Sequence, residues 1–172
     1  MFQINKDILK KNRYKTAIKR KVMSKPLRLA IKAGIVTLER SVHDYGCGRG
    51  DDWKNLLYKG YFATGHDTSG EKRSADVVML TYVINTIEDQ EERYKVLQDA
   101  YYLANRYLVV SVRGDRKTLK NAEPFGDGVV TKRGTFQKFY TNDELQFYTY
   151  DVLGTLVKKL ANNIVVVKKD PS

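Results

Sequence analysis

Three glycines at every second position, Gly46, Gly48 and Gly50, constrain the fold of this chain more than any other feature. They follow a short apolar run over residues 41–45 that is typical of a β-strand, and they precede Asp51, where a helix is predicted to begin. Glycine lacks a Cβ, so the chain can turn sharply here and a ligand can approach bare backbone. An acid suits the first turn of a helix, because the amides there carry partial positive charge. The pattern predicts the strand-turn-helix unit of a parallel α/β sheet.

Carboxylates stand on both sides of this turn. Asp44 lies just before the glycines, and Asp67 ends a second apolar run over residues 62–66. Because ligands of open α/β sheets bind outside the carboxyl ends of the strands, both carboxylates are expected in one crevice. Asp67 is placed to accept hydrogen bonds from both hydroxyls of a ribose, and Asp44 is placed to pair with an ammonium group. The two acids predict a nucleoside ligand that also carries an amino group.

Two nucleoside cofactors compete for such a crevice. The dinucleotide fingerprint spaces its glycines G-x-G-x-x-G and places a pyrophosphate on the helix N-terminus. Here the spacing is G-x-G-x-G, and Asp51 occupies the third glycine position of the fingerprint, where its charge would repel a pyrophosphate. S-adenosylmethionine (SAM) carries an ammonium, a sulfonium and a ribose but no phosphate, so the pattern favours SAM over NAD. A tight turn that binds no ligand is the third interpretation.

The residues predicted to bind SAM lie in this turn or at the tip of the second strand. They are Asp44, Gly46, Cys47, Gly48, Gly50, Asp51, Asp67 and Thr68. Cys47 is the only cysteine, so no disulfide framework is predicted, and with two histidines far from ligand spacing no metal site is predicted either. No run approaches the ~20 apolar residues that span a bilayer, and no signal-peptide pattern is present, so we expect a cytoplasmic protein.

Further strands are predicted over residues 75–80, 107–112 and 164–167, and the clearest helix over residues 88–105. The second strand ends nine positions before residue 75, which is too close for the usual crossover helix and intervening strand. The expected fold is therefore α/β: a trimmed Rossmann-like sheet with helices on both faces, or one in which a bare loop replaces that connection. Residues 1–34 are predicted as a basic helical extension packed on the sheet edge, and residues 35–172 as the SAM-binding domain.

Positive charge is concentrated in the first fifth of the chain. Of the formal net charge of +11, +10 lies in residues 1–32, which hold eleven Lys or Arg and one acid. Self-repulsion on this scale favours a polyanionic partner, so DNA or RNA is predicted, with Lys19, Arg20 and Lys21 among the contacts. A solvated helix face that only aids solubility, a membrane-surface segment and a transit peptide are the alternatives; we predict no membrane partner.

Regular periodicity fails over residues 113–140, and an irregular stretch of this length is usually functional or mobile. Near its end, basic and aromatic side chains alternate, which suits an unstacked nucleotide with its phosphate on the cations and its base on the rings. The residues concerned are Arg133, Phe136, Lys138, Phe139 and Tyr140. The alternative is that the rings only pin this segment to the core. A capping box of Thr141 and Glu144 then predicts a helix, and residues 148–159 are compatible with helix or strand.

With these motifs in place, the chain resembles the class I SAM-dependent methyltransferases, and more narrowly the family of methyltransferases associated with DNA phosphorothioation. The matching motifs are Thr16-Ala17-Ile18-Lys19-Arg20, Ser24-Lys25-Pro26, Asp44-Tyr45-Gly46-Cys47-Gly48-Arg49-Gly50-Asp51-Asp52, Ala75-Asp76-Val77-Val78, Tyr82-Val83-Ile84-Asn85 with Ile87-Glu88-Asp89, and Arg133-Gly134-Thr135-Phe136-Gln137-Lys138-Phe139-Tyr140. The resemblance implies a SAM pocket lined by Asp44, Gly46, Gly48 and Asp67, with the segment after Leu80 near the methyl group.

Methyl transfer from SAM mainly requires orientation of donor and acceptor, which can supply up to about 7–11 kcal/mol. Tyr82 and Asn85 follow a predicted strand, at the edge where ligands bind, and are the predicted catalytic residues. Tyr82 would stack against an acceptor, and Asn85 would hydrogen-bond it. The structural alternatives are that Asn85 caps its loop and that Glu88 begins the next helix.

Two missing motifs restrict the acceptor. No D/N-P-P-Y/F motif and no Pro-Cys nucleophile occurs, which disfavours amino- or C5-methylation of DNA bases by those mechanisms. The sequence predicts methyl transfer to nucleic acid or to a nucleotide-like substrate, with a link to DNA modification. The alternatives are a non-catalytic SAM-fold module that binds nucleic acid, and a methyltransferase for a small molecule or a protein.

Overall fold

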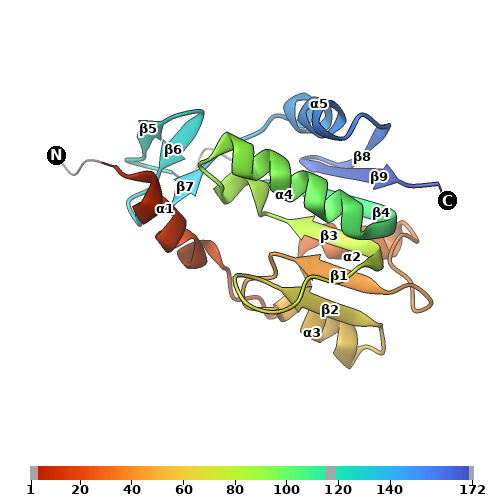
Figure 1. Ribbon diagram of the computed structural model, residues 1–172. Helices are drawn as coiled ribbons and strands as arrows, with labels where there is room; N and C mark the ends of the chain where they lie inside the picture. Colours follow the sequence, from red (N-terminus) through yellow and green to blue (C-terminus); the bar gives the residue numbers. More distant parts are fainter. Residues whose placement is uncertain (1–3, 115–118, 171–172) are drawn as a thin grey trace.

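A six-stranded sheet forms the centre of the computed structural model, which describes residues 4–114 and 119–170 (Figure 1). Its strand order is β2-β1-β3-β4-β9-β8. The strands are β1 (Val42–Tyr45), β2 (Ala63–His66), β3 (Ala75–Thr81), β4 (Ala104–Ser111), β8 (Val157–Ala161) and β9 (Ile164–Lys168). The strands β2, β1, β3 and β4 are parallel, and β9 and β8 run antiparallel to their neighbours. The predicted α/β class and all the predicted strands are confirmed.

The register brings the carboxyl ends of three strands to one edge. Tyr45 at the end of β1 pairs with His66 at the end of β2, and Asp44 lies beside Met79 of β3. Asp67 and Tyr82 directly follow β2 and β3, so both lie at this edge. The sequence prediction that both carboxylates reach one end of the sheet is confirmed at the level of the backbone.

The connection from β2 to β3 is a loop over residues 67–74 without helix or strand. Since β2 and β3 are parallel to β1 and lie on opposite sides of it, the loop runs back along the sheet to the start of β3. Lys72 in this loop donates a hydrogen bond to Asp99 of α4 (Gln90–Leu103), so the loop crosses on the face that α4 covers. The predicted trimmed sheet is confirmed: a bare loop replaces the usual crossover between β2 and β3.

Helices cover both faces of the sheet. On one face, α4 packs on β3 and β4 and buries Leu97, while α5 (Asn142–Leu153) packs on β8 and β9 and buries Leu145. The capping box predicted for the start of α5 is present, and α5 ends at Gly154 in the left-handed region. Residues 148–159, which fitted either structure, divide into the end of α5 and the start of β8.

The opposite face is covered by α2 (Lys25–Lys32) and α3 (Asp51–Tyr58). In α2, Leu27 and Ala30 are fully buried and share a core cluster with residues of β1, β3 and β4. The expectation that this helix packs on the sheet edge is therefore wrong. An apolar stripe one helix face wide is buried more completely by the flat surface of a sheet than by its edge. The division of the chain at residue 34 stays a prediction.

The sequence predicted irregular structure over residues 113–140. This prediction is wrong in part, because residues 119–140 contain a second sheet of three short strands. These are β5 (Glu123–Phe125), β6 (Gly128–Val130) and β7 (Phe136–Gln137). Strands of two or three residues are too short to show a period in the sequence. The helix α1 (Lys6–Asn12) lies beside this sheet and buries Leu9 against Phe136 (Figure 1). Within residues 4–114 and 119–170, no helix has the length and apolar character needed to cross a membrane.

Candidate active site

A cavity of about 280 Å³ opens at the carboxyl ends of β1, β2 and β3. Its walls include six of the residues predicted to bind SAM: Asp44, Gly46, Cys47, Gly48, Asp67 and Thr68. The two predicted residues outside the walls have structural roles at the start of α3. Gly50 precedes the helix with a φ of 75°, and the carboxylate of Asp51 accepts a hydrogen bond from the backbone N–H of Arg20 at 2.7 Å. Gly50 and Asp51 therefore do not line this cavity, and their predicted contact with SAM stays a prediction.

The carboxyl group of Asp44 is the most perturbed acid of the cavity. Its side chain lies in the wall with only 6% of the residue exposed, and it has no hydrogen-bond partner among the described residues. Burial, together with the nearby carboxylate of Asp52, raises the pKa of Asp44 to about 8, while the guanidinium of Arg20 opposes the shift. A buried acid without a partner, aimed into a cavity, is typical of a binding site for a cationic group.

The glycine loop borders the cavity, and two side chains of the protein also pack closely against it. Gly46 has a φ of 72°, and a Cβ added there would lie 2.6 Å from Cγ2 of Val83. Gly48 has a φ of 55°, and its Cβ would lie 3.2 Å from the Cβ of Ala17. The sequence interpretation assigned the glycines to a sharp turn and to ligand contact. The structure confirms the turn through the positive φ of both residues, and it shows that the packing of Val83 and Ala17 also requires glycine here.

One wall of the cavity comes from the N-terminal region. Residues 13–20, named here the N-terminal strap, contribute Arg13, Tyr14, Thr16, Ala17, Ile18 and Arg20 to the lining. The strap follows α1 as a 3₁₀ turn and then extended chain. Its far end is fixed by the bond between Arg20 and Asp51, and further on Ser24 donates hydrogen bonds to the carboxylate of Asp52 through its backbone N–H and its hydroxyl.

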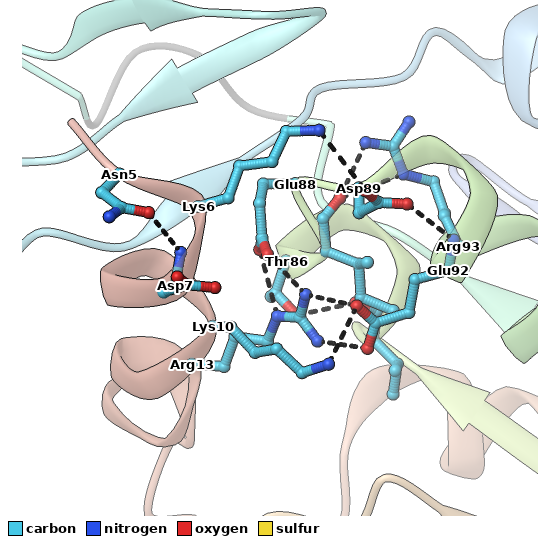
Figure 2. Close-up of polar contacts among 12 residues, drawn as sticks. Asn5, Lys6, Asp7, Lys10, Arg13, Thr86, Glu88, Asp89, Glu92 and Arg93 are labelled. Atoms are coloured by element: carbon cyan, nitrogen blue, oxygen red, sulfur yellow. Dashed lines mark hydrogen bonds and ion pairs between the residues drawn. The ribbon is translucent and has the colours of Figure 1, made fainter.

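The other end of the strap is held by an ion-pair cluster around Arg13 (Figure 2). Its guanidinium donates hydrogen bonds of 2.7 and 3.1 Å to Glu88, whose side chain is only 2% exposed, and of 2.6 and 2.9 Å to Glu92. The hydrogen bond from Arg13 lowers the pKa of Glu92. Lys6 and Lys10 of α1 pair with Asp89 and Glu92 at 3.4 and 3.8 Å. Part of the basic N-terminal region is thus neutralised within the chain.

Glu88 does not begin the next helix, since α4 starts at Gln90 and Asp89 is its N-cap. Glu88 therefore has a structural role, but it is the binding of Arg13 and not the start of a helix. The sequence contained no signal for this pair, because the two residues are 75 positions apart.

A second cavity of about 720 Å³ adjoins the first and shares Thr16, Ile18, Tyr82 and Thr86 with it. Tyr82 stands between the two cavities with a φ of 56°, which is unusual for a residue with a large side chain. Asn85 lies in the second cavity, not in the first. Of the two predicted catalytic residues, one therefore borders both cavities and the other borders only the second.

Asn85 is only 2% exposed, and its amide is half satisfied. The side-chain N–H donates to Oε1 of Gln137 at 3.0 Å, while its Oδ1 is buried without a partner among the described residues. Its backbone carbonyl accepts from the N–H of Lys138, which ties the small sheet to this loop. Asn85 thus does stabilise its loop, but a buried oxygen without a donor is costly and points to a hydrogen-bond donor on a ligand.

The predicted nucleotide-stacking segment is not available for stacking. Phe136, Phe139 and Tyr140 are all buried, and the Nζ of Lys138 lies 3.4 Å from the carboxylate of Asp127. The rings pin the segment to the core, so the stacking prediction is wrong and its alternative is confirmed. Three of the other predicted contacts, Lys19, Lys21 and Arg133, are exposed, whereas Arg20 lines the first cavity.

A polar network that no sequence motif had indicated lies beside the first cavity. His66 lines the cavity, and its Nδ1 lies 2.7 Å from Nε2 of His43. Burial lowers the pKa of His43 to about 4 and also lowers the pKa of His66 below its ordinary value, so both rings are neutral at pH 7. Tyr45 donates a hydrogen bond to Asp99 at 2.6 Å, and Lys72 pairs with the same carboxylate. The position of His66 directly before Asp67 was a usable signal. Among the described residues no cluster of side chains is suited to a metal ion.

The fold is similar to that of solved methyltransferases. A SAM-dependent methyltransferase from Methanosarcina mazei aligns over 83% of this chain and 98% of its own, with 15% identity and a TM-score of 0.55. The 1,6-didemethyltoxoflavin-N1-methyltransferase of Burkholderia thailandensis, solved with 1,6-didemethyltoxoflavin and S-adenosylhomocysteine (SAH), aligns over 86% of this chain and 76% of its own, with 13% identity and a TM-score of 0.56. A sugar N-methyltransferase from Streptoalloteichus aligns over 86% and 85%, with 13% identity and a TM-score of 0.56.

This likeness shows the fold: the chain has the Rossmann-like fold of class I SAM-dependent methyltransferases, as the sequence predicted. No protein-family model matches the sequence, and no curated protein matches it. The narrower resemblance to the methyltransferases associated with DNA phosphorothioation stays a prediction.

Proposed function

We propose that this protein is a SAM-dependent methyltransferase that binds SAM in the first cavity. The observation that carries the proposal is the position of Asp44 and Asp67. They stand at or just beyond the ends of adjacent parallel strands, and both line the same cavity together with the backbone of Gly46 and Gly48. The fold of the neighbouring methyltransferase structures supports the same conclusion.

The residues present suit SAM. The unpaired carboxyl of Asp44 matches an ammonium group, and the exposed carboxylate of Asp67 is positioned for ribose hydroxyls. Gly46 and Gly48 turn the loop into the cavity wall. When bound, SAM supplies a methyl carbon that its sulfonium has already activated. The task left to the protein is to hold donor and acceptor in line and to exclude water.

The acceptor is proposed to occupy the second cavity, with Tyr82 at the boundary between the two. The free oxygen of Asn85 would accept a hydrogen bond from an N–H or O–H group of the acceptor and so orient its lone pair. A general base is not required when the acceptor loses its proton late. Both residues therefore act in this scheme by positioning the acceptor.

For the acceptor itself we propose a nucleic acid or a nucleotide-like molecule. The exposed cations Lys19 and Lys21 lie on or next to the strap that walls both cavities, and Lys25 of α2 and Arg113 line the second one. Such a cluster favours phosphate. The resemblance to methyltransferases associated with DNA phosphorothioation agrees with this acceptor.

One observation favours a second candidate, a small-molecule acceptor. The second cavity has a volume in the range of small-molecule sites, and the neighbouring structures include enzymes that methylate 1,6-didemethyltoxoflavin and a sugar. Transfer of a labelled methyl group from SAM to DNA, to RNA and to a small-molecule extract distinguishes the two candidates. A protein that binds SAM but labels none of the three would instead be a binding module.

The cofactor assignment is tested by calorimetry with SAM and SAH. Asp67→Asn is expected to weaken both ligands about 10- to 100-fold, because hydrogen bonds to a charged group contribute about 1.5–3 kcal/mol. Asp151→Asn, which changes an exposed carboxylate on α5, is the matched control and should bind like the wild type. Absence of binding by the wild type, or equal affinity in Asp67→Asn, would contradict the assignment.

The nucleic-acid proposal has a separate test. The double variant Lys19→Glu with Lys21→Glu should flatten the dependence of DNA or RNA binding on salt, because each lost phosphate contact lowers the slope by about 0.9 on duplex DNA. Lys158→Glu with Lys159→Glu makes the same charge change on the edge strand β8, where both side chains are exposed, and should leave the slope unchanged. Equal slopes for both variants would reject a specific role for the strap.

A further inference from the structure

We infer that Arg20 binds the carboxylate of the methyl donor, so that Asp44 and Arg20 together hold both charges of its amino-acid end. This inference rests on the proposed function and assigns a role to a residue that the sequence analysis gave to nucleic-acid contact. It concerns the N-terminal strap, which lies outside the glycine-loop motif.

The first support is the placement of the guanidinium. Arg20 lines the same cavity as Asp44, and its guanidinium lies 5.7 Å from the ring centroid of Tyr82, which lines that cavity too. Its charge is close enough to Asp44 to oppose the rise of that pKa. The guanidinium is therefore directed toward the interior of the site, unlike the exposed side chains of Lys19 and Lys21 on either side of it.

The second support is the lack of an anionic partner for the guanidinium. Among the described residues, the guanidinium of Arg20 forms no hydrogen bond and no ion pair, whereas those of Arg13 and Arg93 are each held by carboxylates. Asp44 and Arg20 do not pair with each other either, so a cation and an acid face one cavity without contact. An α-amino acid group carries an ammonium and a carboxylate on one carbon, and each would meet the opposite charge.

The third support is the way in which Arg20 is fixed. Its backbone N–H donates to the carboxylate of Asp51 in the first turn of α3, at 2.7 Å. This bond explains why an acid follows the glycine loop although Asp51 does not reach the cavity. It holds the Cα of Arg20 at the cavity wall, within reach of a carboxylate bound in the cavity, and the planar fork of a guanidinium suits bidentate binding of such a carboxylate.

The inference predicts discrimination between two ligands that differ only at the amino-acid end. SAH carries the ammonium and the carboxylate, whereas 5′-methylthioadenosine has the same nucleoside and lacks both. Loss of Arg20 should therefore matter for SAH alone. Loss of Asp67, which is assigned to the ribose, should matter for both.

The test is calorimetry of the full chain with each ligand. Arg20→Gln is expected to weaken SAH about 10- to 100-fold, the range for charge-assisted hydrogen bonds, and to leave the affinity for 5′-methylthioadenosine within about twofold. Arg20→Lys keeps the charge without the fork and should recover part of the affinity. Lys158→Gln, which removes an exposed cation on β8, is the control and should leave both affinities unchanged.

The outcomes separate this inference from the proposed function. If the wild type binds neither ligand, the SAM assignment fails and this inference fails with it. If the wild type binds SAH and Arg20→Gln binds it equally well, only the role of Arg20 is overturned. Equal losses for SAH and 5′-methylthioadenosine would also overturn it, because they would show that Arg20 supports the structure of the cavity and not one end of the ligand.

Discussion

Replacing Asp44 by asparagine should stabilise the protein while it removes cofactor binding. In the folded chain the carboxyl of Asp44 has its pKa raised from an ordinary 3.8 to about 8, mainly by burial and then by Asp52. Below pH 4 the group is protonated in both the folded and the unfolded chain, so Asp44 costs no stability. As the pH rises toward 8, the unfolded chain gains by releasing a proton that the folded chain retains. Stability is therefore lost across this window.

The magnitude follows from the width of the window. Each pH unit between about 4 and 8 costs about 1.4 kcal/mol, so Asp44 destabilises the fold by about 4 kcal/mol at pH 7. The amide that replaces the carboxyl group does not titrate, so the advantage of Asp44→Asn should grow from near zero at pH 4 and level off above pH 8. For a chain of this size, a gain of about 4 kcal/mol raises Tm by about 8–16 °C.

Urea unfolding followed by circular dichroism at pH 5, 6, 7 and 8 measures this dependence. Asp151→Asn shows the effect of removing an exposed carboxylate on α5 and serves as the control. The same Asp44→Asn protein should lose affinity for SAH, since it has no charge for the ammonium. A stability gain of Asp44→Asn that is equal at all four pH values, or largest at pH 5, would refute the conclusion that burial raises the pKa of Asp44 and that the site suits a cation.

Two further predictions concern the packing of the N-terminal region. Arg13→Ala leaves Glu88 buried without its partner, so we expect the free energy of unfolding in urea to fall by about 3–5 kcal/mol and proteolysis before residue 20 to become faster. Arg13→Lys should recover part of the loss, and an unchanged unfolding midpoint in Arg13→Ala would contradict a stabilising role for the ion-pair cluster. Phe136→Ala should cost about 3–5 kcal/mol, because its ring fills the core between α1 and the small sheet; a loss no larger than that of the exposed Phe147→Ala would show that this core contributes little.

The central sheet could be predicted because its signals are local. The apolar runs of β3 and β4 are continuous, as expected for strands covered on both faces, and Asp44 and Asp67 mark the carboxyl ends of β1 and β2. The capping box of Thr141 and Glu144 at the start of α5 could be predicted for the same reason. Each of these features depends on residues within a few positions of one another.

The remaining features depend on residues far apart in the sequence. Nothing near Phe136 shows that its ring is buried by Leu9, so an alternation of basic and aromatic residues was interpreted as a binding surface. Val83 and Ala17 reach the glycine loop from distant segments, and Arg13 meets Glu88 across 75 positions. The role of Arg20 depends on a backbone bond to Asp51, which composition and charge cannot reveal.

The N-terminal strap has one consequence for how the two sites communicate. Thr16 and Ile18 form part of the wall of both cavities, so a displacement of this short segment changes the shape of each. If the bound donor moves Arg20 toward the interior of the first cavity, the strap moves with it and changes the shape of the second cavity, where the acceptor is proposed to bind. By thermodynamic reciprocity, an acceptor that prefers this setting must tighten the donor by the same factor. Positive cooperativity between donor and acceptor would then be built into a short segment that precedes the sheet itself.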